Sequence, residues 1–146
     1  VYTPVTYQVD YSVPEYGMAG DDKLYFAPPT ATHLVQSGRI APYLDCAGPE
    51  ERTQDLLLWA PRMRQGTETI TLPAGYKVAR LPEDRDIDGP IASLKTTTEV
   101  KGRKLVFTYE LIIKRRQIPV DQYGNFREVV QEALALPEDL IVLERK

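Results

Sequence analysis

The sequence has very little of the residue types that usually carry metal or thiol chemistry. Its 146 residues include one cysteine, Cys46, and one histidine, His33. A single cysteine excludes an intrachain disulfide and any multi-cysteine zinc or iron–sulfur site, and a single histidine excludes every motif built on a histidine pair. We therefore predict no cofactor and assign no metal site from these two residues.

Long apolar runs and a strong charge of one sign are also missing. The longest strongly apolar stretch, residues 56–60, is far shorter than the ~20 residues of a membrane-spanning helix, so no membrane insertion is predicted. The net charge is −3, from 18 basic and 21 acidic residues. The basic clusters at 101–104 and 114–116 fall at a predicted hairpin turn and a strand end, where solvated charge is ordinary, so no nucleic acid is expected as a partner.

The length and composition are typical of one folded domain spanning residues 1–146. Hydrophobic residues make up 42% of the chain and charged residues 27%, which argues against disorder. The sequence opens at Val1 without a methionine or a basic-then-apolar signal pattern. We expect it to be the C-terminal piece of a longer multidomain protein.

Alternation with period two dominates the sequence and predicts strands. The first predicted strand covers 5–11, with Val5, Tyr7, Val9 and Tyr11 on one face, which we expect to line the core. Residues 30–53 show no clear pattern and are expected to form long loops. The other predicted strands cover 23–27, 56–59, 67–72, 76–81, 93–100, 105–113 and 140–143.

One helix is predicted near the C-terminus. Five apolar residues recur there at helical spacing: Phe126, Val129, Val130, Ala133 and Leu134. Asn125 and Glu128 could form a capping box, Asp121 is a competing start, and Pro137 ends the helix. The predicted fold is all-β, mainly an antiparallel β-sandwich, with this one amphipathic helix near the C-terminus.

An acidic stretch resembles the start of a calcium-binding loop. Asp84, Asp86 and Asp88 occupy positions one, three and five, followed by Gly89. Position twelve, where a bidentate glutamate belongs, is Lys95, and no helices are predicted to flank the stretch. A solvated acidic turn is the favoured interpretation, with calcium as the alternative.

Cys46 and His33 are the only residues that could form a thiol nucleophile and its base. Thiol catalysis needs a histidine to take the proton and a third group to orient it. No recognisable nucleophile motif surrounds Cys46, and a lone cysteine is more often a small buried residue. A Cys46/His33 thiol hydrolase is kept as the third alternative for function.

Tyrosine is the dominant aromatic residue, with nine tyrosines against three phenylalanines and one tryptophan. Five of the nine occur in the first 25 residues. Tyr7 and Tyr11 are in phase with Val5 and Val9 and are assigned to the core. The remaining three could form an exposed patch that binds protein or glycan: Tyr2, Tyr16 and Tyr25.

Several short motifs together resemble a known family. Residues 69–78, TITLPAGYKV, followed by Leu81-Pro82, look like its strand, LPxGY turn and strand. The strand 105–113, Ile118-Pro119 and the helix around Phe126 also fit, so the match is best over 64–143. The family is a bacterial C-terminal domain of unknown function that follows a transglutaminase-like core, usually with another uncharacterised β-domain at the N-terminus.

The resemblance implies a non-catalytic accessory domain whose partners are the upstream domains of the same parent chain. In the transglutaminase-like core, catalysis uses cysteine, histidine and aspartate in that order. Here His33 precedes Cys46, so no catalytic residue is carried over. Such parents are commonly exported to the periplasm or cell envelope. The alternative function is a carbohydrate- or glycan-binding module that uses exposed tyrosines.

Overall fold

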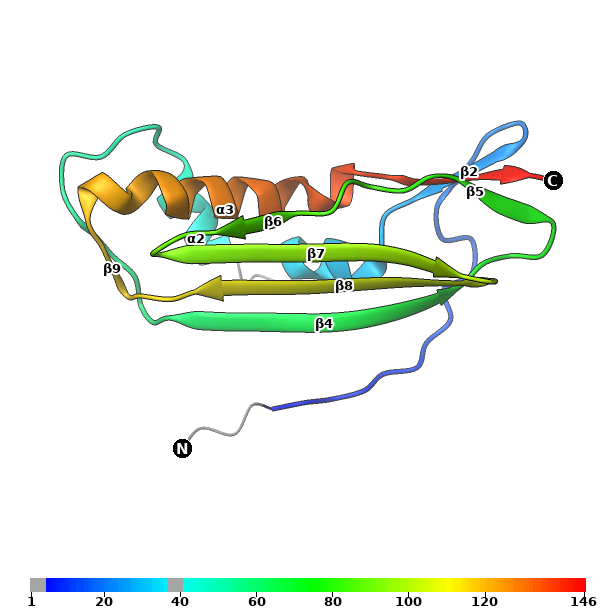
Figure 1. Ribbon diagram of the computed structural model, residues 1–146, viewed down its shortest axis with the longest axis horizontal. Coiled ribbons are helices and arrows are strands. Elements are labelled where there is room, and N and C mark those ends of the chain that lie inside the picture. Colours follow the sequence, from blue (N-terminus) through cyan, green and yellow to red (C-terminus); the bar gives the residue numbers. More distant parts are fainter. Residues whose placement is uncertain (1–4, 37–40) are drawn as a thin grey trace.

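A computed structural model describes residues 5–36 and 41–146 of the chain (Figure 1). Its largest sheet is antiparallel and has the order β4-β8-β7-β6. These strands are β4 (Arg62–Thr71), β8 (Lys104–Ile113), β7 (Ala92–Lys101) and β6 (Asp86–Asp88). The β7–β8 turn contains Gly102 at φ 64°, in the left-handed region that glycine adopts without strain. β4 stands at one end of this strand order and is therefore an edge strand of the sheet.

A second antiparallel sheet has the order β1-β2-β10-β5 and brings the C-terminal strand into the middle. Its strands are β1 (Met18–Ala19), β2 (Lys23–Phe26), β10 (Ile141–Arg145) and β5 (Tyr76–Arg80). A small third sheet pairs β3 (Leu56–Leu57) with β9 (Gln117–Ile118). The predicted antiparallel β fold is confirmed, with the strands distributed over several sheets.

The main helix, α3 (Tyr123–Ala135), lies along the largest sheet and packs against β7 (Figure 1). Short 3₁₀ turns flank it, η1 (Val120–Gln122) and η2 (Leu136–Glu138). Its buried stripe confirms four of the five predicted core positions, while Leu134 is only partly buried. Complete burial of a side chain such as Phe126 contributes about 2–3 kcal/mol to stability.

The expectation of long loops over 30–53 was wrong. Two helices occupy much of this stretch, α1 (Pro29–Gln36) and α2 (Ala41–Ala47). Pro29 occupies the first turn of α1, where its missing N–H costs nothing and its fixed φ favours the helix. Ala31 and Leu34, three residues apart, are the buried residues of α1. The prolines in this stretch had been interpreted only as residues that interrupt secondary structure, so neither helix was predicted.

The predicted strand over 5–11 was also wrong. Within the described part of the chain, this stretch pairs with no strand, and Val5, Tyr7, Val9 and Tyr11 are all exposed. Figure 1 draws it as an extended segment that approaches β4 toward the arrowhead end of that strand. An alternating pattern becomes a buried strand only where a sheet edge accepts its backbone hydrogen bonds, and none does here. Among the described residues, no helix has the length and apolar character needed to cross a membrane.

Candidate functional site

Residues 5–16, called here the N-terminal segment, form the most exposed apolar row of the described chain. Val5 is 92% exposed and Tyr11 is still 53% exposed. Tyr7, Val9 and Val13 are exposed as well. These five residues occupy every second position of the segment, and polar residues lie between most of them. A contiguous exposed row of this kind is a candidate interaction surface.

The segment is attached to the domain through Tyr11 and Glu68. The Tyr11 hydroxyl donates a hydrogen bond to Glu68 Oε1. Glu68 Oε2 accepts two more bonds, from the Thr30 backbone N–H at 3.0 Å and the Thr30 hydroxyl at 2.7 Å. Burial, and then the hydrogen bond and negative charge of Glu68, raise the pKa of Tyr11 above its usual range. Tyr11 therefore stays protonated and remains a donor.

Tyr109 of β8 lies next to this attachment. Gly66 of β4 pairs with Tyr109, and a Cβ at Gly66 would lie 2.5 Å from Tyr109 Cε1, so the ring occupies the space that a side chain would take. Burial raises the pKa of Tyr109, and Tyr7 and Glu68 raise it further, whereas the Arg64 charge lowers it. Tyr7 of the segment therefore lies within electrostatic range of Tyr109.

The three tyrosines of the predicted binding patch have different surroundings, and the patch stays a prediction. Tyr16 is exposed, and its hydroxyl donates to the Ala27 carbonyl at 2.9 Å, which forms a second attachment of the segment. Tyr25 is half-buried on β2, where its ring lies close to Gly20. Tyr2 lies outside the described residues. Tyr7 and Tyr11 are exposed as well, so their assignment to the core was wrong.

Three further large apolar side chains are exposed between β3 and the start of β4. They are Leu57, Trp59 and Met63, and Trp59 is 89% exposed. Leu58, between two of them, is buried, so the exposed members follow the alternation of an extended chain. In the sequence, residues 56–60 form only a short apolar run, which does not predict this exposure.

The three aspartates of the calcium-like stretch each interact with a separate group of the chain. Asp84 Oδ1 accepts from the Thr98 N–H at 3.0 Å, and Asp86 Oδ2 lies 3.9 Å from Lys95 Nζ. Asp88 Oδ1 lies 2.5 Å from Lys114 Nζ, and this hydrogen bond and charge lower the pKa of Asp88. Among the described residues, no three His, Cys, Asp or Glu side chains gather in a way that could hold a metal ion.

His33 and Cys46 lie on different helices. His33 is exposed in the last turn of α1, and Cys46 is half-buried near the end of α2. The Cys46 carbonyl accepts hydrogen bonds from the Tyr123 hydroxyl at 3.1 Å and from Arg52 Nη2 at 3.3 Å. The main chain at Cys46 therefore helps to join α2 to α3.

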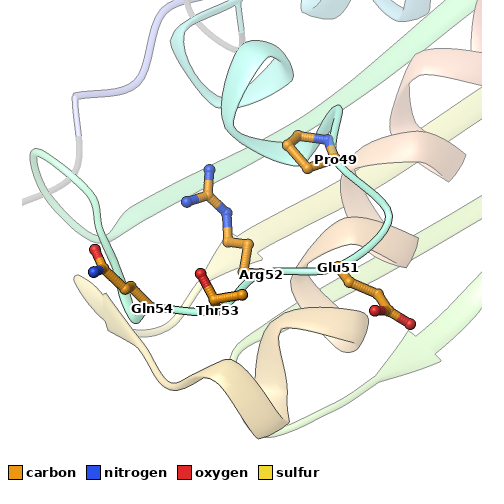
Figure 2. Close-up of a pocket in the computed structure, with 5 residues that line it drawn as sticks. All are labelled: Pro49, Glu51, Arg52, Thr53 and Gln54. Atoms are coloured by element: carbon orange, nitrogen blue, oxygen red, sulfur yellow. The ribbon is translucent and has the colours of Figure 1, made fainter.

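An open hollow of about 290 Å³ lies beside the loop after α2 (Figure 2). It is lined by Pro49, Glu51, Arg52, Thr53 and Gln54. The Arg52 guanidinium stacks over the Tyr123 ring, 5.3 Å from its centroid. Arg52 Nε is buried without a hydrogen-bond partner in the described structure. The contacts of Arg52 with Tyr123 and Cys46 brace this loop against α3.

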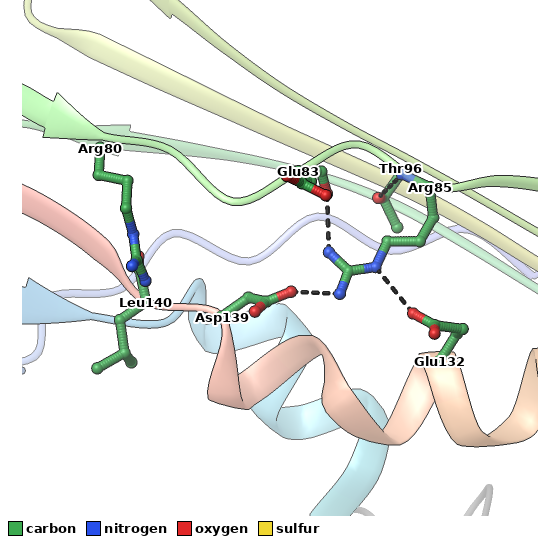
Figure 3. A network of polar contacts seen from close by, with 7 residues as sticks. All are labelled: Arg80, Glu83, Arg85, Thr96, Glu132, Asp139 and Leu140. Carbon is green, nitrogen blue, oxygen red and sulfur yellow. Dashed lines mark hydrogen bonds and ion pairs between the residues drawn. The ribbon is translucent and has the colours of Figure 1, made fainter.

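A polar network around Arg85 joins the β5–β6 connection to the end of α3 (Figure 3). Arg85 Nε lies 3.2 Å from Glu132 Oε2, Nη2 contacts Asp139, and Nη1 donates to the Glu83 carbonyl at 2.7 Å. Burial lowers the pKa of Arg85, but the Asp139 and Glu132 interactions outweigh it and raise that pKa. The network therefore cross-links the β5–β6 connection to α3 and to the residues that follow it.

Comparison with protein families gives a match over most of the chain. The model of DUF3858, described as a domain of unknown function with a solved structure, matches residues 22–143. The chain belongs to the DUF3858 family. The predicted likeness to a family of unknown function is confirmed at that level, and the match starts well before residue 64. The N-terminal segment precedes the part of the chain that matches DUF3858.

A solved structure shares the DUF3858 fold of this chain. It is the crystal structure of a protein from Parabacteroides distasonis ATCC 8503 described as a "putative protease". The TM-score is 0.71 at 17% sequence identity, and the alignment covers 86% of this chain. The chain spans only 24% of the length of that structure. A comparison with curated proteins gives no match.

Proposed function

We propose that this chain is a non-catalytic accessory domain that packs on a transglutaminase-like core, a cysteine peptidase or acyltransferase, in the same parent protein. The exposed apolar row of the N-terminal segment carries the proposal, because an exposed apolar surface of this kind is typical of a site that another protein surface covers. We extend the proposal to the compartment: the parent is exported to the periplasm or cell envelope.

The comparisons support this proposal in two ways. The solved structure that shares the fold is about four times as long as the aligned part, so this fold occurs there joined to further chain. The N-terminal segment lies outside the range that matches DUF3858, so its apolar row is not needed for the core of that domain. A row that the domain itself does not bury is suited to contact a neighbouring domain.

The test uses the chain and a separately expressed transglutaminase-like core from the same reading frame. Calorimetric titration should detect a complex. Val9→Asp should weaken it at least about tenfold, because the charge would enter an apolar interface. Thr6→Asp, on the other side of the segment, is the matched control and should bind like wild type. No complex at high micromolar concentration, or equal binding by both variants, would contradict the proposal.

The non-catalytic part of the proposal is tested separately. The chain alone should neither release ammonia from a glutamine peptide nor transfer its acyl group to an amine. Turnover that disappears in both Cys46→Ala and His33→Ala would instead support the thiol hydrolase.

Glycan binding is the second candidate, favoured by the exposure of Tyr7 and Tyr11. Aromatic rings that stand free of the core can stack on sugar faces. A glycan array probed with the 146-residue chain should then give signals that Tyr7→Ala removes. A blank array would leave the accessory role as the remaining proposal.

A further inference from the structure

We infer that Glu68 is the anchor that fixes the position of the N-terminal segment along β4. One carboxylate joins three parts of the chain that are far apart in sequence: the segment through Tyr11, the start of α1 through Thr30, and its own strand β4. The inference rests on the proposed function in one respect: the segment that Glu68 anchors is the proposed docking surface. Its first test needs no partner.

The burial of Glu68 is unusual for an edge strand and calls for compensation. Only 8% of Glu68 is exposed, although its neighbours Thr67 and Thr69 on β4 are exposed. A buried carboxylate is stable only when hydrogen-bond donors and positive charge surround it. The Thr30 N–H belongs to the first turn of α1, where the helix dipole is positive, and the Thr30 and Tyr11 hydroxyls supply the other donors.

The direction of the segment agrees with this anchor. Tyr11 bonds to Glu68 in the second half of β4, and the chain from residue 5 to Tyr11 runs in the same direction as β4 in Figure 1. Tyr7, nearer the start of the segment, lies within electrostatic range of Tyr109, which pairs with Gly66 two residues before Glu68. The anchor therefore holds the apolar row near β4.

NMR relaxation of the backbone amides of the purified 146-residue chain tests the anchor. In Tyr11→Phe and Glu68→Gln, the order parameters of residues 9–13 should fall from their wild-type values to below about 0.6, the range of flexible backbone. Glu99→Gln is the control and should match wild type, because Glu99 is exposed and pairs with Lys101 of its own strand. The order parameters of β8 should stay high in every variant, which shows that the fold is intact.

Unchanged order parameters of residues 9–13 in Tyr11→Phe would overturn the inference. If Glu68→Gln does not fold, Tyr11→Phe alone decides, since Phe keeps the ring and removes only the hydroxyl. Binding to the core is measured independently. A chain whose segment is anchored but binds no core contradicts the proposed function and leaves the anchor standing. A chain that binds the core, but whose segment is unaffected by Tyr11→Phe, contradicts the anchor and leaves the proposed function standing.

Discussion

Gly89 and Asn125 lie so close that a Cβ on Gly89 would be 2.1 Å from Asn125 Nδ2. The approach lets Asn125 Oδ1 accept hydrogen bonds from two backbone N–H groups, Ile91 at 3.1 Å and Ala92 at 2.9 Å. Both of those residues are completely buried, so no water can replace the side chain. One amide of α3 thereby holds the turn between β6 and β7.

Asn125→Ala should destabilise the chain by about 3 kcal/mol, because two buried N–H groups lose their acceptor. Urea unfolding measures the change. Asn125→Asp, which keeps the accepting oxygen, should cost less. Gly89→Ala should also destabilise, but the double variant Gly89→Ala/Asn125→Ala should lose less than the sum, since the clash disappears with the amide. Additive effects would contradict this account.

Arg85→Met should cost about 1–2 kcal/mol, because the apolar stem is kept while the bonds to Glu132 and Asp139 are lost. Both carboxylates can rehydrate, which limits the loss, whereas the Arg85 side chain is only 14% exposed. Lys101→Met removes the exposed pair with Glu99 and is the control, expected to change stability by less than about 0.5 kcal/mol. Equal unfolding midpoints for the two variants would show that the network is not a cross-link.

The Asp88 carboxyl should titrate below its ordinary pKa of 3.8, because Lys114 stabilises its ionised form. The folded-state pKa is lowered, so the interaction favours folding above the unfolded pKa and is lost as the pH falls through the folded value. Carboxyl NMR measures the titration, and Lys114→Met should return the Asp88 pKa toward 3.8. Lys95→Met, which removes the partner of Asp86, should leave Asp88 unchanged.

Trp59→Ala should change the free energy of unfolding by less than about 0.5 kcal/mol, because the indole is 89% exposed. The neighbouring Leu58→Ala is the matched contrast and should cost about 2–5 kcal/mol, since Leu58 is buried. Both values come from denaturant unfolding. A large loss in Trp59→Ala would mean that the ring packs on the domain.

The sequence pattern alone predicted those helices and hairpins whose buried residues recur at regular spacing within one short stretch. The stripe of α3 and the β7–β8 hairpin with its Gly102 turn could be predicted because spacing and turn chemistry are properties of a short stretch. The helices α1 and α2 could not, since Pro29 is compatible with both a strand end and a first helical turn. Of the two starts proposed for this helix, Asn125 lies inside α3 and accepts bonds from Ile91 and Ala92, whereas Asp121 lies in the 3₁₀ turn that leads into α3.

The sequence by itself determined the antiparallel β class, the C-terminal helix and the scarcity of residues for metal or thiol chemistry, because composition and periodicity are carried by the chain. Only the tertiary structure decided whether residues 5–11 form a buried strand or an exposed segment, because the alternation of apolar and polar residues is the same in both. The contact between Tyr11 and Glu68 joins residues 57 positions apart. No local pattern encodes such a contact, because it depends on how β4 and α1 pack around the carboxylate.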